Sequence, residues 1–332
     1  RTMLFKLKTI AAILNDLDMV DLLPAEREEK IQQLRENIVL LWQSDEMRDR
    51  PPTVMDEVRN GLYFFENTLY ELVPRIYAEL ERALAEAYPG EEFILPPFLR
   101  YGSWVGGDRD GNPFVDLSVT EETLRAHKDL ILELYAQTVE SLYDHLSSAV
   151  TRTGFSEAFW ESLRGDFKLV PAQEREVLDR FEQEPYRQKL IMMFRRLAAT
   201  RTVNRHAWHE QAPERRAYGD AQEFLADLYI IRDSLLQNKG ERVARSRLAE
   251  LIRAVEIFGF HLATLDIRQH AERHRSAVAE VMERYGLARR YESMPEQDRV
   301  ALLSREIGGK RPLTAQLDFS DETNETVGLF RL

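Results

Sequence analysis

A stretch of thirteen residues, Tyr101–Pro113, combines four glycines, three charged side chains and one tryptophan. Glycine tolerates positive φ and carries no Cβ, so this density indicates backbone that turns sharply or approaches another group closely. Within the stretch, Asp108-Arg109-Asp110 places a bidentate donor between two carboxylates. Such an arrangement orders a loop or presents charge to a ligand. The stretch is therefore the first candidate for a binding loop.

A second candidate lies in the segment Phe260–Gln269, where alternating positions would point to opposite sides of a strand. The residues of one side are Leu262, Thr264, Asp266 and Arg268. An arginine at the carboxyl end of a strand, facing a cleft, can clamp a phosphate group. Arg268 could equally pair with Asp266 on the same strand face. The residues alone leave both interpretations open.

Trp104 and Arg109 also have ordinary structural interpretations. Most tryptophans are core aromatics, although Gly106 and Gly107 beside Trp104 favour a face that lines a pocket. An arginine flanked by aspartates is more often part of a structural ion pair than a contact to a ligand. For both residues the structural role is at least as well supported as the functional one.

Several familiar motifs are missing from the sequence. The glycine stretch has neither the Gly-Lys-Ser/Thr of a phosphate loop nor GxGxxG spacing. The run Asp108–Asn112 differs from a calcium loop, because its glycine comes too early and Val119 stands where a bidentate glutamate belongs. Two histidine pairs could each share a helical face: His206 with His209, and His270 with His274. Neither has the acidic partner of an HExxH motif, so we interpret them as polar-face histidines and predict no metal site.

The composition is that of an acidic chain with enough apolar residues for a large core. The 332 residues carry a formal net charge of −12, and 44% of them are hydrophobic. This charge argues against nucleic acid or an anionic membrane as a partner. The absence of cysteine excludes disulfides and thiolate metal sites, and no apolar run reaches the roughly 18 residues of a membrane span. The start at Arg1 has no signal-peptide pattern, and we expect both ends to be truncated.

Helical periodicity dominates the chain outside these two segments. An apolar stripe runs over residues 31–42, and Thr53 with Asp56 forms a capping box that opens a helix with a long buried edge over residues 58–80. A short buried strand is predicted in Phe93–Tyr101, leading into the glycine stretch. Thr120 is expected to cap the next helix, and Ser293 the last one. Further helices are predicted over residues 157–165, 173–182, 185–210, 220–237, 241–258 and 271–285.

We therefore predict a mainly α fold, with many amphipathic helices around a few strands of an incomplete β/α (TIM-like) barrel. Both predicted strands run into polar loops, and ligands gather at the carboxyl ends of barrel strands, so both junctions are candidate sites. Two strands cannot close a barrel. We therefore expect residues 1–332 to form a single piece of a longer protein.

The glycine stretch resembles the phosphoenolpyruvate carboxylase family of bacteria and plants. Tyr101–Pro113 matches the family hallmark Phe-Gly-Ser-Trp-Met-Gly-Gly-Asp-Arg-Asp-Gly-Asn-Pro almost letter for letter, and Leu265–Gln269 is similar to its LDIRQ segment. Other similar stretches are Ser44–Arg48, Glu184–Arg187 and Gly309–Leu313. They follow in the family's order, so the resemblance spans essentially the whole chain.

The resemblance implies an N-terminal-half piece of a cytoplasmic, homotetrameric enzyme that carboxylates phosphoenolpyruvate with bicarbonate, using Mg²⁺ or Mn²⁺. Arg268 matches an arginine that binds substrate phosphate, and Trp104 matches a tryptophan of the apolar wall beside the substrate's methylene carbon. Three arginines match, or in the first case could match, residues of a sugar-phosphate activator site in plant members: Arg1, Arg48 and Arg187. The matched loop residues are Gly106, Gly107, Asp108, Arg109, Asp110 and Asn112.

The same resemblance implies that this piece contains no catalytic residue. The family's catalytic histidine lies in a Thr-Ala-His-Pro-Thr segment upstream of Arg1, and its metal-binding carboxylates and Gly-Arg-Gly-Gly loop lie beyond Leu332. His270 also replaces the acidic residue that usually follows the arginine–glutamine pair, whereas His274 matches a family histidine. We expect the piece to be inactive alone; the alternative is a non-catalytic regulatory or phosphate-ligand-binding module.

Overall fold

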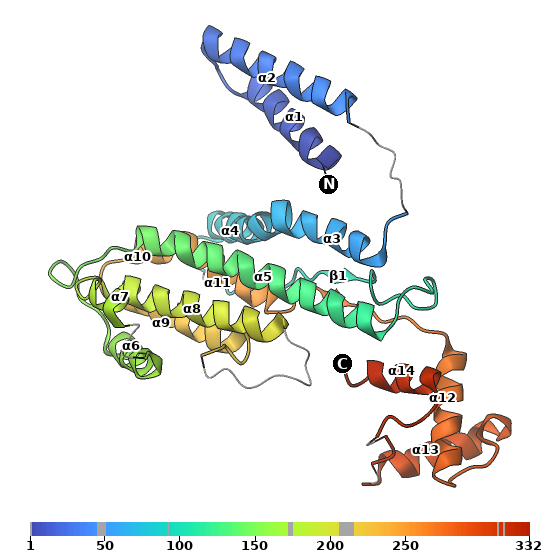
Figure 1. Ribbon diagram of the computed structural model, residues 1–332. Helices are drawn as coiled ribbons and strands as arrows, with labels where there is room; N and C mark the ends of the chain where they lie inside the picture. The colour runs from blue at the N-terminus through green and yellow to red at the C-terminus, as the bar shows by residue number, and fades with distance from the viewer. Residues whose placement is uncertain are drawn as a thin grey trace. The chain divides into compact units, whose positions relative to one another are not determined.

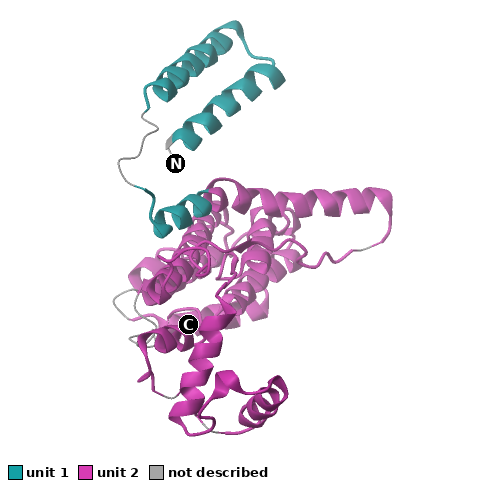
Figure 2. Cartoon of the chain, turned by 90° about the vertical axis from the view of Figure 1, so that its right-hand side faces the viewer, with its two compact units in different colours: residues 1–63 teal, residues 64–332 magenta. Residues whose placement is uncertain are grey.

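The computed structural model describes residues 2–44, 51–91, 93–171, 175–205, 216–310, 312–314 and 316–332. The chain falls into two compact units, residues 1–63 and residues 64–332 (Figure 2). Helices dominate both units, and the strands of the described residues are two short segments of the second unit. The predicted mainly α class is confirmed.

The first unit contains α1 (Thr2–Met19), α2 (Pro24–Trp42) and most of α3 (Val54–Phe64). The predicted capping box is confirmed, because the Thr53 backbone N–H donates to Asp56 Oδ2 at 3.0 Å and the Asp56 N–H donates to Thr53 Oγ1 at 3.2 Å. The apolar stripe of α2 does form on a helix, yet Trp42 at its end is 89% exposed.

Within its described residues, the second unit begins with a π-helix, η1 (Phe65–Leu69), and continues through eleven α-helices, one 3₁₀ turn and two strands (Figure 1). In chain order these are α4 (Tyr70–Ala87), β1 (Gly102–Ser103), α5 (Leu117–His145), α6 (Glu157–Leu169), α7 (Arg175–Asp179), α8 (Pro185–Arg205), α9 (Ala221–Gln237), α10 (Glu241–Ala244), α11 (Arg247–Phe258), β2 (Thr264–Leu265), α12 (Ala271–Arg284), the 3₁₀ turn η3 (Tyr291–Ser293), α13 (Glu296–Ile307) and α14 (Asp321–Leu329).

The core of this unit is centred on the long helix α5, which lies beside α8 (Figure 1). Ile131 and Tyr135 of α5 are fully buried, as are Leu190 and Leu197 of α8. One charged side chain is also fully buried there. The Lys189 ammonium donates to carboxylates of α6 and α9 and to a serine hydroxyl of α6, so a buried ionic cluster joins three helices.

The predicted buried edge over residues 58–80 is wrong beyond the π-helix. Leu72 and Ile76 are 44% and 37% exposed, whereas Val73 and Tyr77 are buried. A π turn holds one residue more than an α turn, so it shifts every later side chain by one position around the helix. Pro74 follows within α4, where it can donate no backbone hydrogen bond.

The strand predicted in Phe93–Tyr101 is also wrong. This segment has no regular structure, Ile94 is 96% exposed, and β1 begins only at Gly102. Its prolines remove backbone donors, and the Phe98 N–H donates instead to the buried Tyr77 hydroxyl at 2.8 Å. The second predicted strand shortens to β2. The described strands form one two-stranded parallel sheet, and the barrel remains a proposal.

Two predicted helix starts differ from the structure. Asp116, not Thr120, caps α5, because its carboxylate accepts the Val119 N–H at 2.8 Å. At the other end of the unit, Ser293 ends η3, and α13 begins after Pro295. The predicted helix over 241–258 is divided into α10 and α11. The predicted ends at residues 173–174 and 206–210 lie outside the described residues.

Candidate functional site

Parallel pairing of β1 with β2 brings the two predicted strand-to-loop junctions together. The Thr264 N–H donates to the Tyr101 carbonyl at 2.9 Å, and the Asp266 N–H donates to the Ser103 carbonyl at 2.8 Å. In a parallel pair both carboxyl ends lie at the same edge. The glycine loop and Arg268 therefore emerge side by side, from segments far apart in the sequence.

The pairing continues past the strands through an isolated bridge between Asp108 and Arg268. The Arg268 N–H donates to the Gly107 carbonyl at 2.9 Å, and the Arg109 N–H donates to the Arg268 carbonyl at 3.0 Å. Between strand and bridge the loop turns back on itself, since the Gly107 N–H donates to the Trp104 carbonyl at 2.9 Å. Two backbone hydrogen bonds thus fix the position of Arg268 against the loop.

Close packing against neighbouring atoms explains why residues 106 and 107 are glycines. Gly106 has φ +87°, and a Cβ there would lie 2.2 Å from Thr123 Oγ1 of α5. A Cβ at Gly107 would lie 2.3 Å from the carbonyl oxygen of Asp266. The loop is therefore wedged between α5 and β2, and Thr120 of α5 donates its hydroxyl to the Gly106 carbonyl at 2.7 Å.

Trp104 and Arg268 meet at the surface of this loop. The Arg268 Cζ lies 5.3 Å from the centroid of the Trp104 ring, and Trp104 is 54% exposed. The interpretation of Trp104 as a core aromatic is thus wrong. Within the described part of the chain, Arg268 forms no salt bridge with Asp266, and the carboxylate that interacts with it electrostatically is that of Asp108. A guanidinium on an aromatic face, open to solvent, suits a ligand that joins an anionic group to an apolar part.

The charged residues of the loop divide into two groups. Asp108 and Asp110 are exposed or half-buried, and the hydrogen bond from Asp110, followed by partial burial, raises the pKa of Asp108 above its usual value. Arg109 is buried and pairs with Glu325 of α14 at 3.1 Å, so its structural interpretation is the one that the geometry favours. Asn112 shapes the end of the loop by accepting the Phe114 N–H at 3.0 Å.

Glu325 was not found by sequence reasoning, because α14 itself was not predicted. Ser320 caps this helix by accepting the Thr323 N–H at 3.3 Å. A capping serine followed by Asp321 and Glu322 in the first turn is the sequence signal that could have located it.

The Arg187 side chain binds backbone carbonyl groups at the C-terminal end of α5. Its Nε donates to the Tyr143 carbonyl at 3.1 Å, at the C-terminal end of α5, and its Nη1 pairs with Glu184 at 2.8 Å. The guanidinium also lies over the ring of Phe181, 5.7 Å from its centroid. Arg1 and Arg48, the other two expected activator residues, lie outside the described residues.

The described residues contain no group of three His, Asp or Glu side chains that could hold a metal ion. Of the two histidine pairs considered above, His206 and His209 fall in a range that the structure leaves undescribed. His274 packs against Phe330, with ring centroids 5.7 Å apart. The described side chains thus provide no set of ligands for the Mg²⁺ or Mn²⁺ that the resemblance implies.

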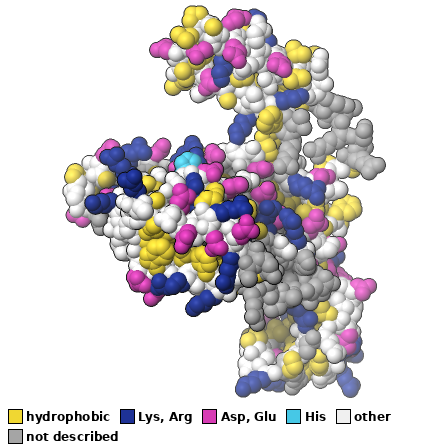
Figure 3. Space-filling model, turned by 60° about the vertical axis from the view of Figure 1, so that its left-hand side comes forward, with side chains coloured by type: hydrophobic (Ala, Val, Ile, Leu, Met, Phe, Trp, Pro, Cys, Tyr) yellow, Lys and Arg dark blue, Asp and Glu magenta, His cyan; other side chains and the backbone are white. Residues whose placement is uncertain are grey.

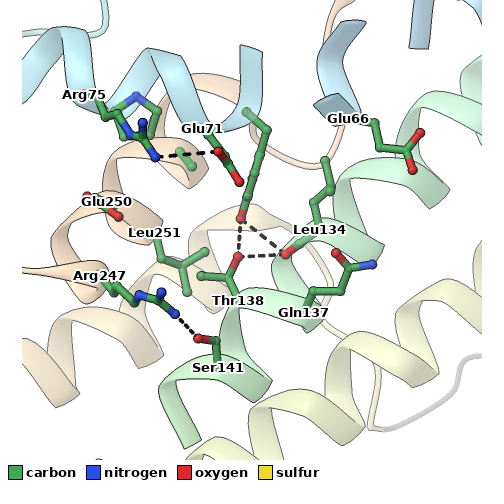
Figure 4. Close-up of a pocket in the computed structure, with 13 residues that line it drawn as sticks. Glu66, Glu71, Arg75, Leu134, Gln137, Thr138, Ser141, Arg247, Glu250 and Leu251 are labelled. Atoms are coloured by element: carbon green, nitrogen blue, oxygen red, sulfur yellow. Dashed lines mark hydrogen bonds and ion pairs between the residues drawn. The ribbon is translucent and has the colours of Figure 1, made fainter. Parts of the chain in front are cut away.

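A polar cavity of about 310 Å³ lies between α4, α5 and α11 (Figure 4). Arg75 and Glu71 form an ion pair at its edge at 3.6 Å, and Arg247 extends to the Ser141 hydroxyl. None of the candidate residues named in the sequence analysis lines this cavity. It is separate from the site at the sheet.

Acidic and basic side chains of the described residues are interspersed over most of the face drawn in Figure 3. Among the described helices, none combines the length and the apolar character needed to cross a membrane.

The buried His127 of α5 is expected to make the stability of the fold depend on pH. It is 4% exposed and hydrogen-bonded to the backbone of Ala263 next to β2, and burial lowers its pKa below the usual 6.5. The unfolded chain therefore binds a proton more readily than the folded one, so stability falls as pH drops below 6.5. We expect the His127→Gln variant to lose less stability than the parent between pH 7.5 and 5.5, as measured by urea unfolding. His145→Gln, on the same helix, should keep the parent's pH dependence; equal slopes for all three would refute this role.

Comparison with known proteins gives a single family. The family model described as phosphoenolpyruvate carboxylase matches residues 1–332. The phosphoenolpyruvate carboxylase of Roseiflexus castenholzii is 42% identical over 336 residues, which cover 100% of this chain and 36% of that protein.

Other curated relatives agree. The phosphoenolpyruvate carboxylase of Azorhizobium caulinodans is 37% identical, with 97% of this chain and 34% of that protein covered. That of Burkholderia mallei is 38% identical, with 89% and 30% covered. The chain thus spans about a third of the length of the curated relatives it matches.

Proposed function

Since this chain belongs to the phosphoenolpyruvate carboxylase family, we propose that it is part of an enzyme that carboxylates phosphoenolpyruvate with bicarbonate. Bicarbonate oxygen attacks the phosphorus, the bond from phosphorus to the enol oxygen breaks, and carboxyphosphate and the pyruvate enolate form. Carboxyphosphate releases CO₂ and phosphate, and the methylene carbon of the enolate bonds to CO₂ to give oxaloacetate. This anaplerotic reaction requires cations around the phosphate and a water-poor pocket.

The arrangement of Arg268 on Trp104 is the observation that supports this proposal. The Arg268 guanidinium is exposed and makes no salt bridge in the described chain, although Asp108 beside it attracts its charge, so its donors are available to a phosphate group. Trp104 offers an apolar face beside it for the methylene carbon. We assign the phosphate contact to Arg268 and the apolar wall to Trp104, with Gly106, Gly107, Asp108, Arg109, Asp110 and Asn112 as the loop that positions them.

The rest of the parent enzyme supplies the chemistry in this proposal. The described residues contain no group of three His, Asp or Glu side chains that could hold a metal ion, and we assign the binding of Mg²⁺ or Mn²⁺ to the full-length enzyme. We likewise assign the catalytic histidine, the homotetrameric assembly and the cytoplasmic location to the full-length enzyme. We therefore expect this chain alone to bind ligand without turning it over.

A sugar-phosphate activator site is the second part of the proposal. Arg1, Arg48 and Arg187 would hold a sugar phosphate, and Arg187 would have to exchange its contact with Glu184 for the ligand. A phosphate-ligand-binding module without chemistry is the alternative function, because Arg268 on Trp104 could serve it equally well.

The test measures oxaloacetate production with phosphoenolpyruvate, bicarbonate and Mg²⁺, and phosphoenolpyruvate binding by calorimetry. We expect activity in the full-length enzyme and none in this chain alone. Arg268→Ala should weaken phosphoenolpyruvate binding about 10- to 100-fold, because a charge-assisted hydrogen bond contributes roughly 1.5–3 kcal/mol. Arg275→Ala, an exposed arginine of α12, is the matched control and should leave binding unchanged.

Two results would contradict the proposal. A folded full-length protein without carboxylase activity would favour the alternative binding module. Equal binding by Arg268→Ala and Arg275→Ala would show that the phosphate contact lies elsewhere.

A further inference from the structure

Arg109 is buried, whereas the aspartates on either side of it are half-buried (Asp108) and exposed (Asp110). Its side chain is 2% exposed, and its Nε donates to Glu325 Oε1 at 3.1 Å. The terminal nitrogens Nη1 and Nη2 are also buried and have no hydrogen-bond partner in the described part of the chain. A buried guanidinium is costly unless a carboxylate compensates its charge. Glu325 is the carboxylate that is hydrogen-bonded to Arg109, and Asp116 attracts the same guanidinium electrostatically.

Glu325 contacts a second arginine with its other oxygen. Its Oε2 lies 3.7 Å from Nη1 of Arg273, in the first turn of α12, and its own side chain is 24% exposed. Through Arg109 it reaches the loop that is bridged to Arg268, and through Arg273 it reaches the helix that begins three residues after Arg268. The Glu325 carboxylate thus contacts both the loop that is bridged to Arg268 and the helix that follows Arg268.

The backbone bridge between residues 108 and 268 links the Arg109–Glu325 ion pair to Arg268. The Arg109 N–H donates to the Arg268 carbonyl, and the Arg268 N–H donates to Gly107, so the loop and Arg268 move together. The stacking of Arg268 on Trp104 depends on the same register, because Trp104 belongs to the turn that Gly107 closes. A shift of Arg109 would change the direction of the Arg268 guanidinium.

We infer that the buried Arg109–Glu325 ion pair is a positioning device, which holds Arg268 over Trp104 in the orientation that binds the substrate's phosphate. The phosphate part of this inference rests on the function proposed above. Glu325 touches no ligand in this account and acts only through Arg109, Arg273 and the bridge.

Glu322 provides a matched control on the same helix. It pairs with Arg273 at 3.2 Å, but the two side chains are 58% and 46% exposed. Exposed ion pairs contribute little, whereas breaking a buried pair leaves an uncompensated charge. Glu325→Gln should therefore disturb the site and Glu322→Gln should not.

The experiment has two readouts. Amide hydrogen exchange, followed in this chain and in the full-length enzyme, should become about tenfold faster at Arg109 and Arg268 in Glu325→Gln, because the bridge opens more often. In the full-length enzyme the same variant should raise KM for phosphoenolpyruvate about tenfold while kcat changes less than about threefold, since orientation of the bound phosphate is lost. Arg109→Lys, which keeps the charge, should show a smaller increase in KM. Glu322→Gln should match the parent in both readouts.

The outcomes distinguish the positioning role of the Arg109–Glu325 pair from the phosphate-binding role of Arg268. Exchange at Arg268 that is equal in Glu325→Gln and Glu322→Gln overturns it. So does an unchanged KM in Glu325→Gln when Arg268→Ala raises KM strongly. Faster exchange in Glu325→Gln, combined with an unchanged KM in both Glu325→Gln and Arg268→Ala, supports the positioning of Arg268 and refutes its phosphate role.

Discussion

Replacing Lys189 by methionine is expected to lower the free energy of unfolding by about 3–5 kcal/mol, which is the range for breaking a buried ion pair. The Lys189 ammonium donates to Asp166 at 2.7 Å, to Asp227 at 2.6 Å and to Ser162 at 2.8 Å, and its side chain is 0% exposed. Methionine would leave two buried carboxylates without this cation. Total stabilities are about 5–15 kcal/mol, so the loss should be visible in urea unfolding.

The pH dependence identifies the cause of this loss. Burial raises the pKa of Asp166 above 3.8, and Lys189 partly offsets that effect. Without Lys189 the folded-state pKa of Asp166 should rise further above its unfolded value, so protonation would favour folding. The loss should therefore be largest near pH 8 and smaller near pH 5.

Two further variants control this prediction. Lys168→Met, an exposed lysine of α6, should change stability by less than about 0.5 kcal/mol. Asp166→Asn added to Lys189→Met should recover part of the loss, because Asp227 keeps Arg196 as a partner at 3.2 Å. A loss that is independent of pH and unaffected by Asp166→Asn would show that packing, not charge, determines the effect.

Alanine at Gly107 is expected to abolish the organisation of the candidate site. The new Cβ would lie 2.3 Å from the Asp266 carbonyl oxygen, which belongs to backbone paired with β1. The strands can make room only by separating at the bridge to Arg268, and overpacking of this kind costs about 1–3 kcal/mol or more. Phosphoenolpyruvate binding by calorimetry should weaken at least about tenfold, since 1.4 kcal/mol corresponds to a factor of ten.

Gly165→Ala is the matched control for this substitution. Gly165 lies inside α6, and a Cβ there would meet nothing within 4 Å. Alanine is the better helix former, so we expect this variant to be slightly more stable than the parent, with unchanged ligand binding. If Gly107→Ala bound phosphoenolpyruvate as tightly as Gly165→Ala does, the close packing of loop and strand would not matter for the site.

The helices were largely predictable because their signals are local. Apolar spacing and caps located α2, α6, α9 and α12 within a few residues, and Gly286 with φ +66° follows α12. The face of α4 was not predictable in this way. One additional residue in the π turn at Phe65–Leu69 moved the buried positions, and sequence periodicity does not register such a turn.

The candidate site was predictable only in part. Glycine density and the alternating pattern pointed to the loop and to Arg268, because both are local features of the sequence. The pairing of these segments, the exposure of Trp104 and the ion pair between Arg109 and Glu325 come from tertiary contacts between distant segments. No periodicity encodes such contacts. Whether the strands belong to a barrel is still a prediction.

The long separation between the paired segments also has a consequence for how the protein folds. Arg109 and Glu325 are 216 positions apart in the chain, whereas each helix forms from neighbouring residues. Closing such a long loop costs entropy that is recovered only when its ends pair, and non-local contacts slow folding for this reason. The loop, Arg268 and α14 should therefore become ordered late, after the helices around α5 have packed. A nascent chain would then carry an assembled helical core before it can hold a ligand.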